Sequence, residues 1–396
     1  MTMEASLLEQ LLASAERAQG RGSRYVARIR LKGDPGYAGL GFDAREALHA
    51  QMRIAERRGA VTLTWSRFGG EDRRLDAVVL ADIEALASVL GRRSLSGAVR
   101  VASDAFAPWV ERVPALASVL AAWKAAKRVR GHGPEKHADF VDAARVVAHM
   151  QSRIEDAVVR AVSIDLFGDS KRIEEIVPLL DALTAESIAA AASHWEDVLA
   201  NLGLRKAPSP FLLAGRGRVH LIESGWRDLA YEYLAVSPTQ VDGFEGMIEW
   251  VLLVENLTTF DLCAKARPDR EGGLVLYTAG MPSPSWRRAC EAVLSGLGEH
   301  IPVYHWGDID VGGFRIAASV ARAIYPRTLR PWLMDSRSLR DIARTSPASL
   351  TERRKMARSA GRAGWPVLAE HLASPASVLL EQEAVPVCFP AVALPS

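Results

Sequence analysis

Two short apolar runs that end in acidic residues decide the fold of the second half of this sequence: VLLVEN at 251–256 and PVYHWGDIDVGGFRI at 302–316. Similar runs, LVLYTAG (274–280) and TLRPWLM (328–334), accompany them, with room for a helix between most pairs. Continuous apolar runs are typical of strands buried on both faces of a parallel sheet. Because these runs alternate with helical segments, they predict an α/β layer structure.

Three carboxylates stand at the ends of the predicted strands. Glu255 ends VLLVE, and Asp308 and Asp310 end PVYHWGDID. Functional groups in open parallel sheets collect just beyond the carboxyl ends of the strands, so we expect these acids to lie together. Neighbouring acids repel one another unless a cation compensates, and Mg²⁺ or Mn²⁺ prefers oxygen ligands. The pattern predicts a metal site suited to phosphodiester chemistry.

Two other interpretations of the Asp308-x-Asp310 pair fit less well. A dehalogenase-type phosphatase needs Thr or Val two residues after the second Asp, where Gly312 stands. An EF-hand loop that starts at Asp308 needs Glu at its twelfth position, where Ser319 stands.

The bulk composition is that of a soluble globular protein. The chain has 396 residues, 49% hydrophobic residues and a net charge of +2, and its length predicts two or three domains. No apolar run approaches the roughly 20 residues of a membrane-spanning helix. The N-terminus indicates an amphipathic helix and not a signal peptide. Three isolated cysteines argue against a disulfide framework or a zinc site and fit a reducing cytoplasm.

Positive charge is concentrated in two clusters. Between residues 92 and 132 the basic residues far outnumber the acids, and a second cluster lies at 353–362. Either cluster can neutralise phosphates or form a solvated helix face. The candidate DNA contacts are Lys127, Arg128, Lys171 and Arg172, and for the last two an ion pair with Glu174 or Glu175 is an equal alternative.

The first half of the sequence predicts an α+β structure. VTLTWSRF and RLDAVVLA flank GGED (69–72) and indicate a β-hairpin. AVVRAVSIDLFG (157–168) favours a strand, and residues 185–203 favour a helix that ends at Gly203. PSPFLLAGRGRVHL (208–221) indicates a tight hairpin with a domain boundary near residue 215. The order helix, hairpin, helix fits a winged-helix-like module, although many small folds share it.

Several of these motifs resemble one known family. VENLTTF and WGDIDVGGFRI look like the Toprim domain of the JetD family, the nuclease subunits of Wadjet anti-plasmid systems. That family is related to the topoisomerase VI A subunit and the meiotic break-forming recombinase. Further similar stretches are FGDSKRIE (167–174), SPTQVDGF (237–244), YTAGMPSPSW (277–286) and LEQEAV (380–385).

The resemblance implies a multidomain chain that acts on DNA. An N-terminal arm (1–107) and a winged-helix, CAP-like region (108–215) would precede a Toprim domain with a parallel sheet (216–396). Glu255, Asp308 and Asp310 match the family's metal-binding acids. The implied assembly is a homodimer with an SMC-type motor, a kleisin and accessory subunits, and no membrane partner.

The absence of a suitably placed tyrosine separates two enzymatic interpretations. Topoisomerase VI-type enzymes cut DNA with a winged-helix tyrosine, and no tyrosine lies between residues 38 and 230 here. Metal-activated water is then the natural nucleophile.

We therefore expect a cytoplasmic, metal-dependent endonuclease that cleaves double-stranded plasmid DNA. The alternatives are a topoisomerase-like strand-breaking protein, an inactive DNA-binding adaptor and, more distantly, a phosphatase or primase. The roles of His305, Glu381 and Glu383 stay open.

Overall fold

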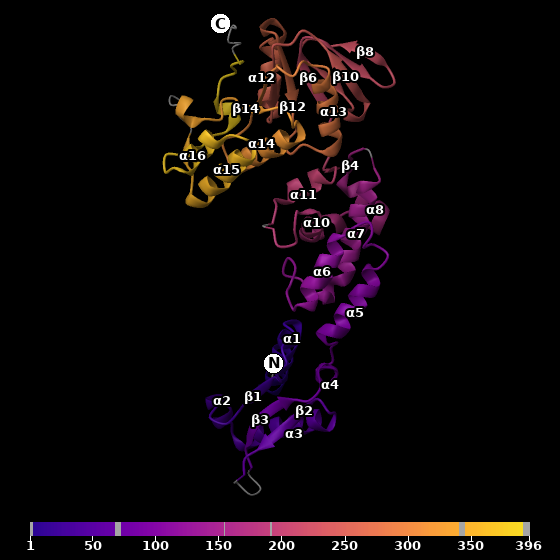
Figure 1. Cartoon of the computed structure of the whole chain (residues 1–396), viewed down its shortest axis with the longest axis vertical. Coiled ribbons are helices and arrows are strands. Elements are labelled where there is room, and N and C mark those ends of the chain that lie inside the picture. The colour runs from indigo at the N-terminus through magenta and orange to yellow at the C-terminus, as the bar shows by residue number, and fades with distance from the viewer. Residues whose placement is uncertain (1–2, 68–72, 154, 191, 340–344, 391–396) are drawn as a thin grey trace. The chain divides into compact units, whose positions relative to one another are not determined.

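The protein is a mixed α/β structure with several sheets, one of them largely parallel (Figure 1). The computed structural model describes residues 3–67, 73–153, 155–190, 192–339 and 345–390. The chain divides into two compact units. The N-terminal unit comprises Met1–Ala148 and Glu174–Ala192, and the C-terminal unit comprises His149–Ile173 and Ser193–Ser396. The expected three-domain division at residues 107 and 215 stays a prediction.

A three-stranded antiparallel sheet forms one part of the N-terminal unit. Its strands are β1 (Arg28–Arg30), β2 (Val61–Trp65) and β3 (Leu75–Leu80), in the order β1-β3-β2. The antiparallel pairing of β2 with β3 confirms the predicted hairpin strands, while the GGED turn lies outside the described residues. Val61 and Leu63 alternate with exposed threonines on β2, so one face of the sheet is buried.

Helices make up most of the remaining N-terminal unit. An aromatic cluster of Phe106, Trp123 and Phe140 joins three of them, with ring centroids 5.6 Å apart for the first pair and 5.2 Å apart for the second. Asp82 caps the helix that follows the hairpin by accepting a hydrogen bond from the Ala85 amide, as Asp does at helix starts. The helices are α1 (Met3–Gly20), α2 (Pro35–Ala38), α3 (Phe42–Arg57), α4 (Ile83–Val89), α5 (Leu95–Phe106), α6 (Ala115–Lys124), α7 (His137–Gln151), α9 (Arg172–Glu175) and α10 (Val177–Thr184).

Two predictions for the middle of the chain are corrected. The predicted strand at 157–168 is mostly a helix, α8 (Val159–Phe167). Val159, Val162 and Ser163 are buried at helical spacing, so packing of this face overrides the strand preference of β-branched residues. The predicted helix at 185–203 is shorter, because α11 spans only Trp195–Asn201.

A six-stranded sheet is the centre of the C-terminal unit. Its order is β14-β13-β11-β12-β6-β9, and the first four strands run parallel to one another. All five residues of β11 are buried, which explains its uninterrupted apolar sequence. The four apolar runs predicted as strands are therefore confirmed. The strands are β6 (Phe211–Gly215), β9 (Leu234–Val236), β11 (Trp250–Val254), β12 (Gly273–Tyr277), β13 (Val303–Trp306) and β14 (Leu329–Pro331).

The predicted hairpin at 208–221 is wrong. Its first strand, β6, pairs with β12 and β9 in the large sheet. Its second strand, β7 (Arg218–Leu221), pairs with β8 (Gly225–Asp228) and β10 (Val241–Glu245) in a separate sheet. Gly215 and Gly217 have φ values of 136° and 130°, and at both positions a Cβ would collide with neighbouring main chain. The two glycines thus let the chain pass from one sheet to the other.

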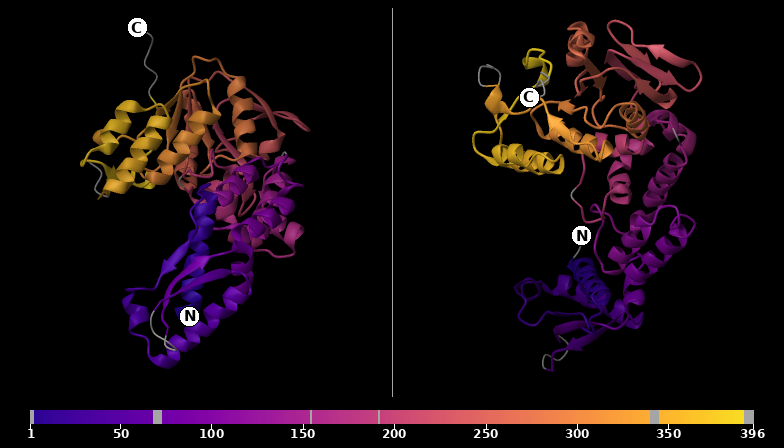
Figure 2. Two further views of the ribbon diagram at one scale, coloured as in Figure 1. Left: turned by 60° about the horizontal axis from the view of Figure 1, so that its bottom comes forward. Right: turned by 45° about the horizontal axis from the view of Figure 1, so that its top comes forward.

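Helices border the large sheet of the C-terminal unit. Figure 2 shows α14, α15 and α16 as a layer beside the strands. The smaller strand pairs are β4 (Ala157–Val158) with β5 (Leu204–Arg205), and β15 (Ser346–Pro347) with β16 (Val378–Leu379). The helices are α12 (Leu257–Lys265), α13 (Pro284–Ser295), α14 (Val311–Ala323), α15 (Leu350–Arg362) and α16 (Pro366–Ala373). Among the described residues, no helix combines the length and apolar character needed to cross a bilayer.

Candidate metal centre

The topology of the sheet brings the predicted acids to one edge. β11 and β13 are neighbouring parallel strands, with Val254 opposite Trp306. Glu255 follows β11 directly, and its amide donates to the Trp306 carbonyl over 3.1 Å. Asp308 and Asp310 lie in the segment that leaves β13 at the same edge. The expectation that the acids gather beyond the carboxyl ends of adjacent strands agrees with this placement.

Gly307 sets how closely the two strand ends approach each other. A Cβ at this position would lie 2.5 Å from Oε2 of Glu255 and 3.1 Å from Nε2 of His305. A larger residue here would push the Glu255 carboxylate away from its present position.

Burial and mutual repulsion make the ionised acids costly. Burial raises the pKa of Glu255 to about 8, and the charges of Asp308 and Asp310 add to the effect. Burial also raises the pKa of Asp308 to about 6, and repulsion by Glu381 and other acids adds to this rise. A hydrogen bond from Gln382 acts in the opposite direction and lowers the pKa. Oε2 of Glu255 is buried, and no hydrogen-bond donor reaches it from the described residues. A divalent cation would compensate the burial of the ionised carboxylates, their mutual repulsion and the missing donor at Glu255.

Asp308 and Asp310 are held by different contacts. Asp310 is the N-cap of α14, and its Oδ1 accepts a hydrogen bond of 2.6 Å from the Gly313 amide. Oδ1 of Asp308 accepts a hydrogen bond of 2.7 Å from the amide of Gln382 in the C-terminal tail. Each carboxylate therefore has one oxygen fixed by the main chain and a second oxygen free of that contact.

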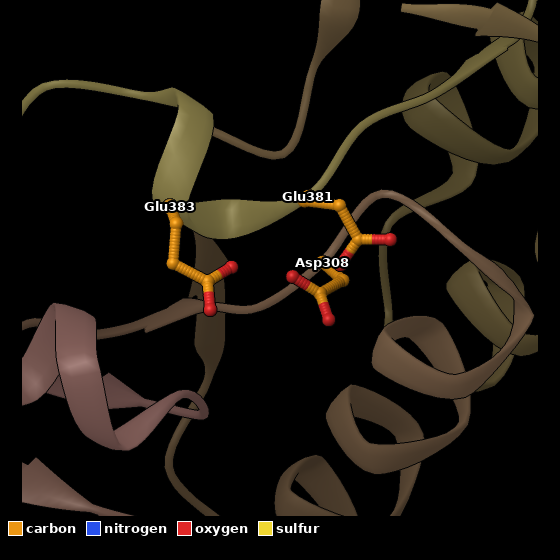
Figure 3. A group of neighbouring side chains, drawn as sticks. All are labelled: Asp308, Glu381 and Glu383. Carbon is orange, nitrogen blue, oxygen red and sulfur yellow. The ribbon is translucent and has the colours of Figure 1, made fainter. Parts of the chain in front are cut away.

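The tail adds two carboxylates that the sequence left open. Ligand oxygens of Asp308, Glu381 and Glu383 lie within 4.8 Å of one another (Figure 3). Figure 3 shows Glu381 and Glu383 extending from the tail segment toward Asp308. Glu255 and Asp310 do not belong to this tight group, so Asp308 stands between two sets of acids.

Gln382 fastens the tail to the strand ends, and sequence reasoning missed this residue. Its side chain is buried, donates to the Trp306 carbonyl over 2.8 Å and accepts from the Asn256 amide over 2.9 Å. Ile309 and Leu380 also form a β-bridge. Because Gln382 lies more than 70 residues from Asp308 in the sequence, only the flanking acids of LEQE signalled its position.

His305 belongs to the core. It is fully buried on β13, and neither ring nitrogen has a hydrogen-bond partner within the described part of the chain. Burial lowers its pKa to about 3, so the ring is neutral at physiological pH. The structure therefore places this residue, whose role the sequence left open, in the core.

A cavity of about 700 Å³ opens beside the acids. Glu255 and Asp310 line it together with Arg205, Lys206 and Arg315. All five residues belong to the C-terminal unit. Sequence reasoning missed Arg205 and Arg315, because neither lies in a basic run.

The four predicted DNA contacts are not among the described residues that line this cavity. Lys127 and Arg128 belong to the N-terminal unit and are exposed, and Nη2 of Arg128 lies 2.6 Å from Oε1 of Glu135. Lys171 is exposed beside α9, and Arg172 begins that helix. Their role in binding DNA stays a prediction.

The donor set fits Mg²⁺ or Mn²⁺. The tight group of Asp308, Glu381 and Glu383 and the neighbouring Glu255 and Asp310 offer carboxylate oxygens, the ligand type that these hard cations prefer. The buried Glu255 oxygen has no donor among the described residues, and a bound cation would satisfy it. Glu255, Asp308 and Asp310 would hold the ion, with Glu381 and Glu383 close to Asp308.

Comparison with known proteins gives the family. Residues 203–391 match the family model "Wadjet protein JetD, C-terminal", and residues 8–184 match the model "Uncharacterized protein conserved in bacteria N-term (DUF3322)". The chain is 31% identical over 97 residues to the Wadjet protein JetD of Bacillus cereus (strain Q1), an alignment that covers 24% of this chain and 23% of that protein. The chain thus spans about a quarter of that relative in the alignment. Residues 203–391 therefore belong to the family of JetD C-terminal regions.

Proposed function

We propose that the chain is a metal-dependent DNA endonuclease and the effector subunit of a Wadjet defence complex. Its C-terminal unit would be a Toprim-type catalytic domain that cleaves double-stranded plasmid DNA. The proposed partners are an SMC-type motor, a kleisin and accessory subunits, with the chain acting as a homodimer in the cytoplasm. The match of residues 203–391 to JetD C-terminal regions supports the defence role.

One observation carries the nuclease proposal. Glu255 and Asp308 end neighbouring parallel strands, and Asp310 caps the next helix beside the same cavity. Arg315 compensates only part of this crowding, because the pKa of Glu255 stays raised to about 8, and a metal ion or protons would supply the rest. Bound Mg²⁺ or Mn²⁺ would supply an activated water and stabilise the charge that develops on a phosphodiester.

The chain's own residues would hold the site in place. Gly313 fixes one oxygen of Asp310, and the Gln382 amide fixes one oxygen of Asp308. The main chain packed at Gly307 restricts the position of Glu255. Such restraints orient ligands before the substrate arrives, which lowers the reorganisation that the reaction requires.

A topoisomerase-like mechanism would need a tyrosine at the cavity. Tyr277 is the tyrosine that lines it, at the end of β12. Burial raises the pKa of Tyr277 above its usual value, and the charge of Glu255 raises it further. Arg205 acts in the opposite direction, so we keep metal-activated water as the proposed attacker and test Tyr277 directly.

Plasmid cleavage by the purified full-length chain tests the function. We expect supercoiled plasmid to be cut with Mn²⁺ and left intact with EDTA, and no protein to remain covalently attached to DNA on denaturing gels. Tyr277→Phe should cut like the unchanged protein. A phosphotyrosyl adduct would instead support the topoisomerase-like alternative. Complete absence of metal-dependent cutting, with DNA binding retained, would support the inactive adaptor.

The basic row of α15 is expected to bind DNA phosphates. Arg354, Lys355, Arg358 and Arg362 are exposed, and three of them recur at intervals of four residues on one helix face. Arg354→Glu with Arg358→Glu should weaken binding to all DNA sequences alike and flatten its salt dependence by about one slope unit for each phosphate that is no longer bound. Fluorescence anisotropy against several duplexes at increasing salt measures both effects.

The Lys127→Glu, Arg128→Glu pair tests the other cluster. We expect a smaller reduction in affinity than on α15, since Glu135 already neutralises Arg128. Affinity and salt slope equal to those of the unchanged protein would show that a cluster is only a solvated face.

A further inference from the structure

The cavity beside the acids also carries cations that are already paired. Nη2 of Arg315 lies 2.6 Å from Oδ2 of Asp197, and Nζ of Lys206 lies 2.9 Å from Oε1 of Glu196. Both cations line the same cavity as Glu255. The cavity is therefore lined by acids that suit metal ions and by two cations that are already paired with carboxylates of the chain itself.

One short helix supplies both of these carboxylates. Glu196 and Asp197 are adjacent in the first turn of α11. The helix has seven residues, and Asn201 at its other end accepts a hydrogen bond of 2.7 Å from Arg287 on α13. These two neighbouring acids thus pair with two cations of the kind that bind the phosphates of nucleic acids.

Arg315 is only partly satisfied by its carboxylate partner. Its Nε is buried, and the described residues provide no acceptor for it. The carboxylate of Asp197 is itself largely buried, with 11% of its side-chain surface exposed. A phosphate offers more charge and more acceptor oxygens than a carboxylate, and a guanidinium can bind it through two parallel hydrogen bonds. A phosphate therefore has the chemistry to compete with Asp197 for Arg315.

We propose that Arg315 and Lys206 form a binding site for the phosphates of the DNA strand in the cavity, and that Asp197 and Glu196 of α11 occupy this site until DNA displaces them. The inference rests on the proposed nuclease function and extends it to the residues that receive the substrate. Arg315 is five residues beyond Asp310 on α14, so a phosphate bound there lies on the same helix as a predicted metal ligand. The acids of α11 then compete with DNA phosphates for Arg315 and Lys206, and so weaken DNA binding in the cavity.

Binding of a short DNA strand without metal tests the site. The probe is a fluorescein-labelled oligothymidylate of eight nucleotides, mixed with the full-length chain in EDTA at low salt. Asp197→Asn preserves shape and removes charge, so it should tighten binding by about tenfold, as expected when a close charge competitor is removed. Arg315→Ala should weaken binding and abolish the gain when combined with Asp197→Asn. Arg315→Lys should keep part of the affinity.

Two further variants separate charge competition from loosening of the helix. Asn201→Ala removes the other anchor of α11 and leaves both acids in place, so its affinity should equal that of the unchanged protein. Glu196 is exposed, so Glu196→Gln should fold even if Asp197→Asn does not, and it should tighten binding by about two- to threefold, as for a weak surface pair. The proposal is overturned if Asp197→Asn and Glu196→Gln leave affinity unchanged, or if Asn201→Ala gives the same gain.

The binding readout stays independent of cleavage. If the protein fails to cut DNA with Mn²⁺ but these variants behave as expected, the phosphate site stands and the nuclease function fails. If cutting occurs and the variants bind equally, the nuclease function stands and the phosphate site fails.

Discussion

Neutralising any one of the three predicted metal ligands should abolish plasmid cleavage. We expect Glu255→Gln, Asp308→Asn and Asp310→Asn each to lower the Mn²⁺-dependent cutting rate by at least about 100-fold, because each removes a charged ligand from a crowded acid set. The amide side chains keep the volume, and Asn caps helices as well as Asp does. A time course of supercoiled plasmid conversion measures the decrease.

The same variants should fold at least as well as the unchanged protein. The pKa of Glu255 is raised from 4.5 to about 8, so the folded metal-free protein holds this proton more tightly than the unfolded chain does. Stability therefore falls as the pH rises from about 4.5 through 8, by on the order of 2–4 kcal/mol. Glu255→Gln lacks this decrease. Urea unfolding at pH 5 and pH 8.5 should therefore show that the free energy of unfolding of the variant rises relative to that of the unchanged protein as the pH increases.

An exposed acid of the same unit provides the matched control. Asp261 on α12 pairs with Lys265 at the surface. Asp261→Asn should leave both the cutting rate and the pH dependence of unfolding unchanged. Near-normal cutting by all three ligand variants would remove the metal assignment.

Adding one methyl group at Gly313 should disrupt both fold and site. A Cβ at this position would lie 2.2 Å from the Asp308 carbonyl oxygen and 3.0 Å from the Asp308 nitrogen, and neither main-chain atom can turn aside. We expect Gly313→Ala to lower the free energy of unfolding by about 2–4 kcal/mol and to displace Asp308, as overpacking against rigid neighbours does. Urea unfolding and plasmid cutting measure the two effects.

Gly361 is the control for this substitution. It also lies within a helix, α15, and no atom stands within 4 Å of the position a Cβ would take. Gly361→Ala should therefore raise the free energy of unfolding by about 0.5–1 kcal/mol, since Ala favours the helix over Gly. A stable, active Gly313→Ala protein would contradict the close packing at the strand end.

The four strands of the parallel sheet could be predicted from sequence because burial on both faces makes them continuously apolar. VLLV at β11 contains no polar residue, and its acid stands where the strand ends. The position of Glu255, Asp308 and Asp310 at one edge follows from parallel strand direction alone. Local patterns of this kind need no knowledge of distant partners.

Local patterns failed where distant contacts chose the structure. Residues 157–168 contain many β-branched residues, yet their buried face has helical spacing. β6 and β7 are five residues or fewer in length and nearly adjacent in sequence, and they join different sheets because Gly215 and Gly217 adopt positive φ. A hairpin and a crossing between sheets have the same apolar and glycine pattern, so tertiary pairing decides between them.

The sequence by itself determined the parallel sheet, the acids at its edge and the family to which the motifs point. Only the tertiary structure placed Gln382 and its flanking glutamates beside Asp308, and only it brought Asp197 to Arg315 across more than 100 residues. Strand ends are fixed by a local run of apolar residues and by strand direction. Contacts between the tail, α11 and α14 depend on how separate segments pack, and no spacing within either partner encodes them.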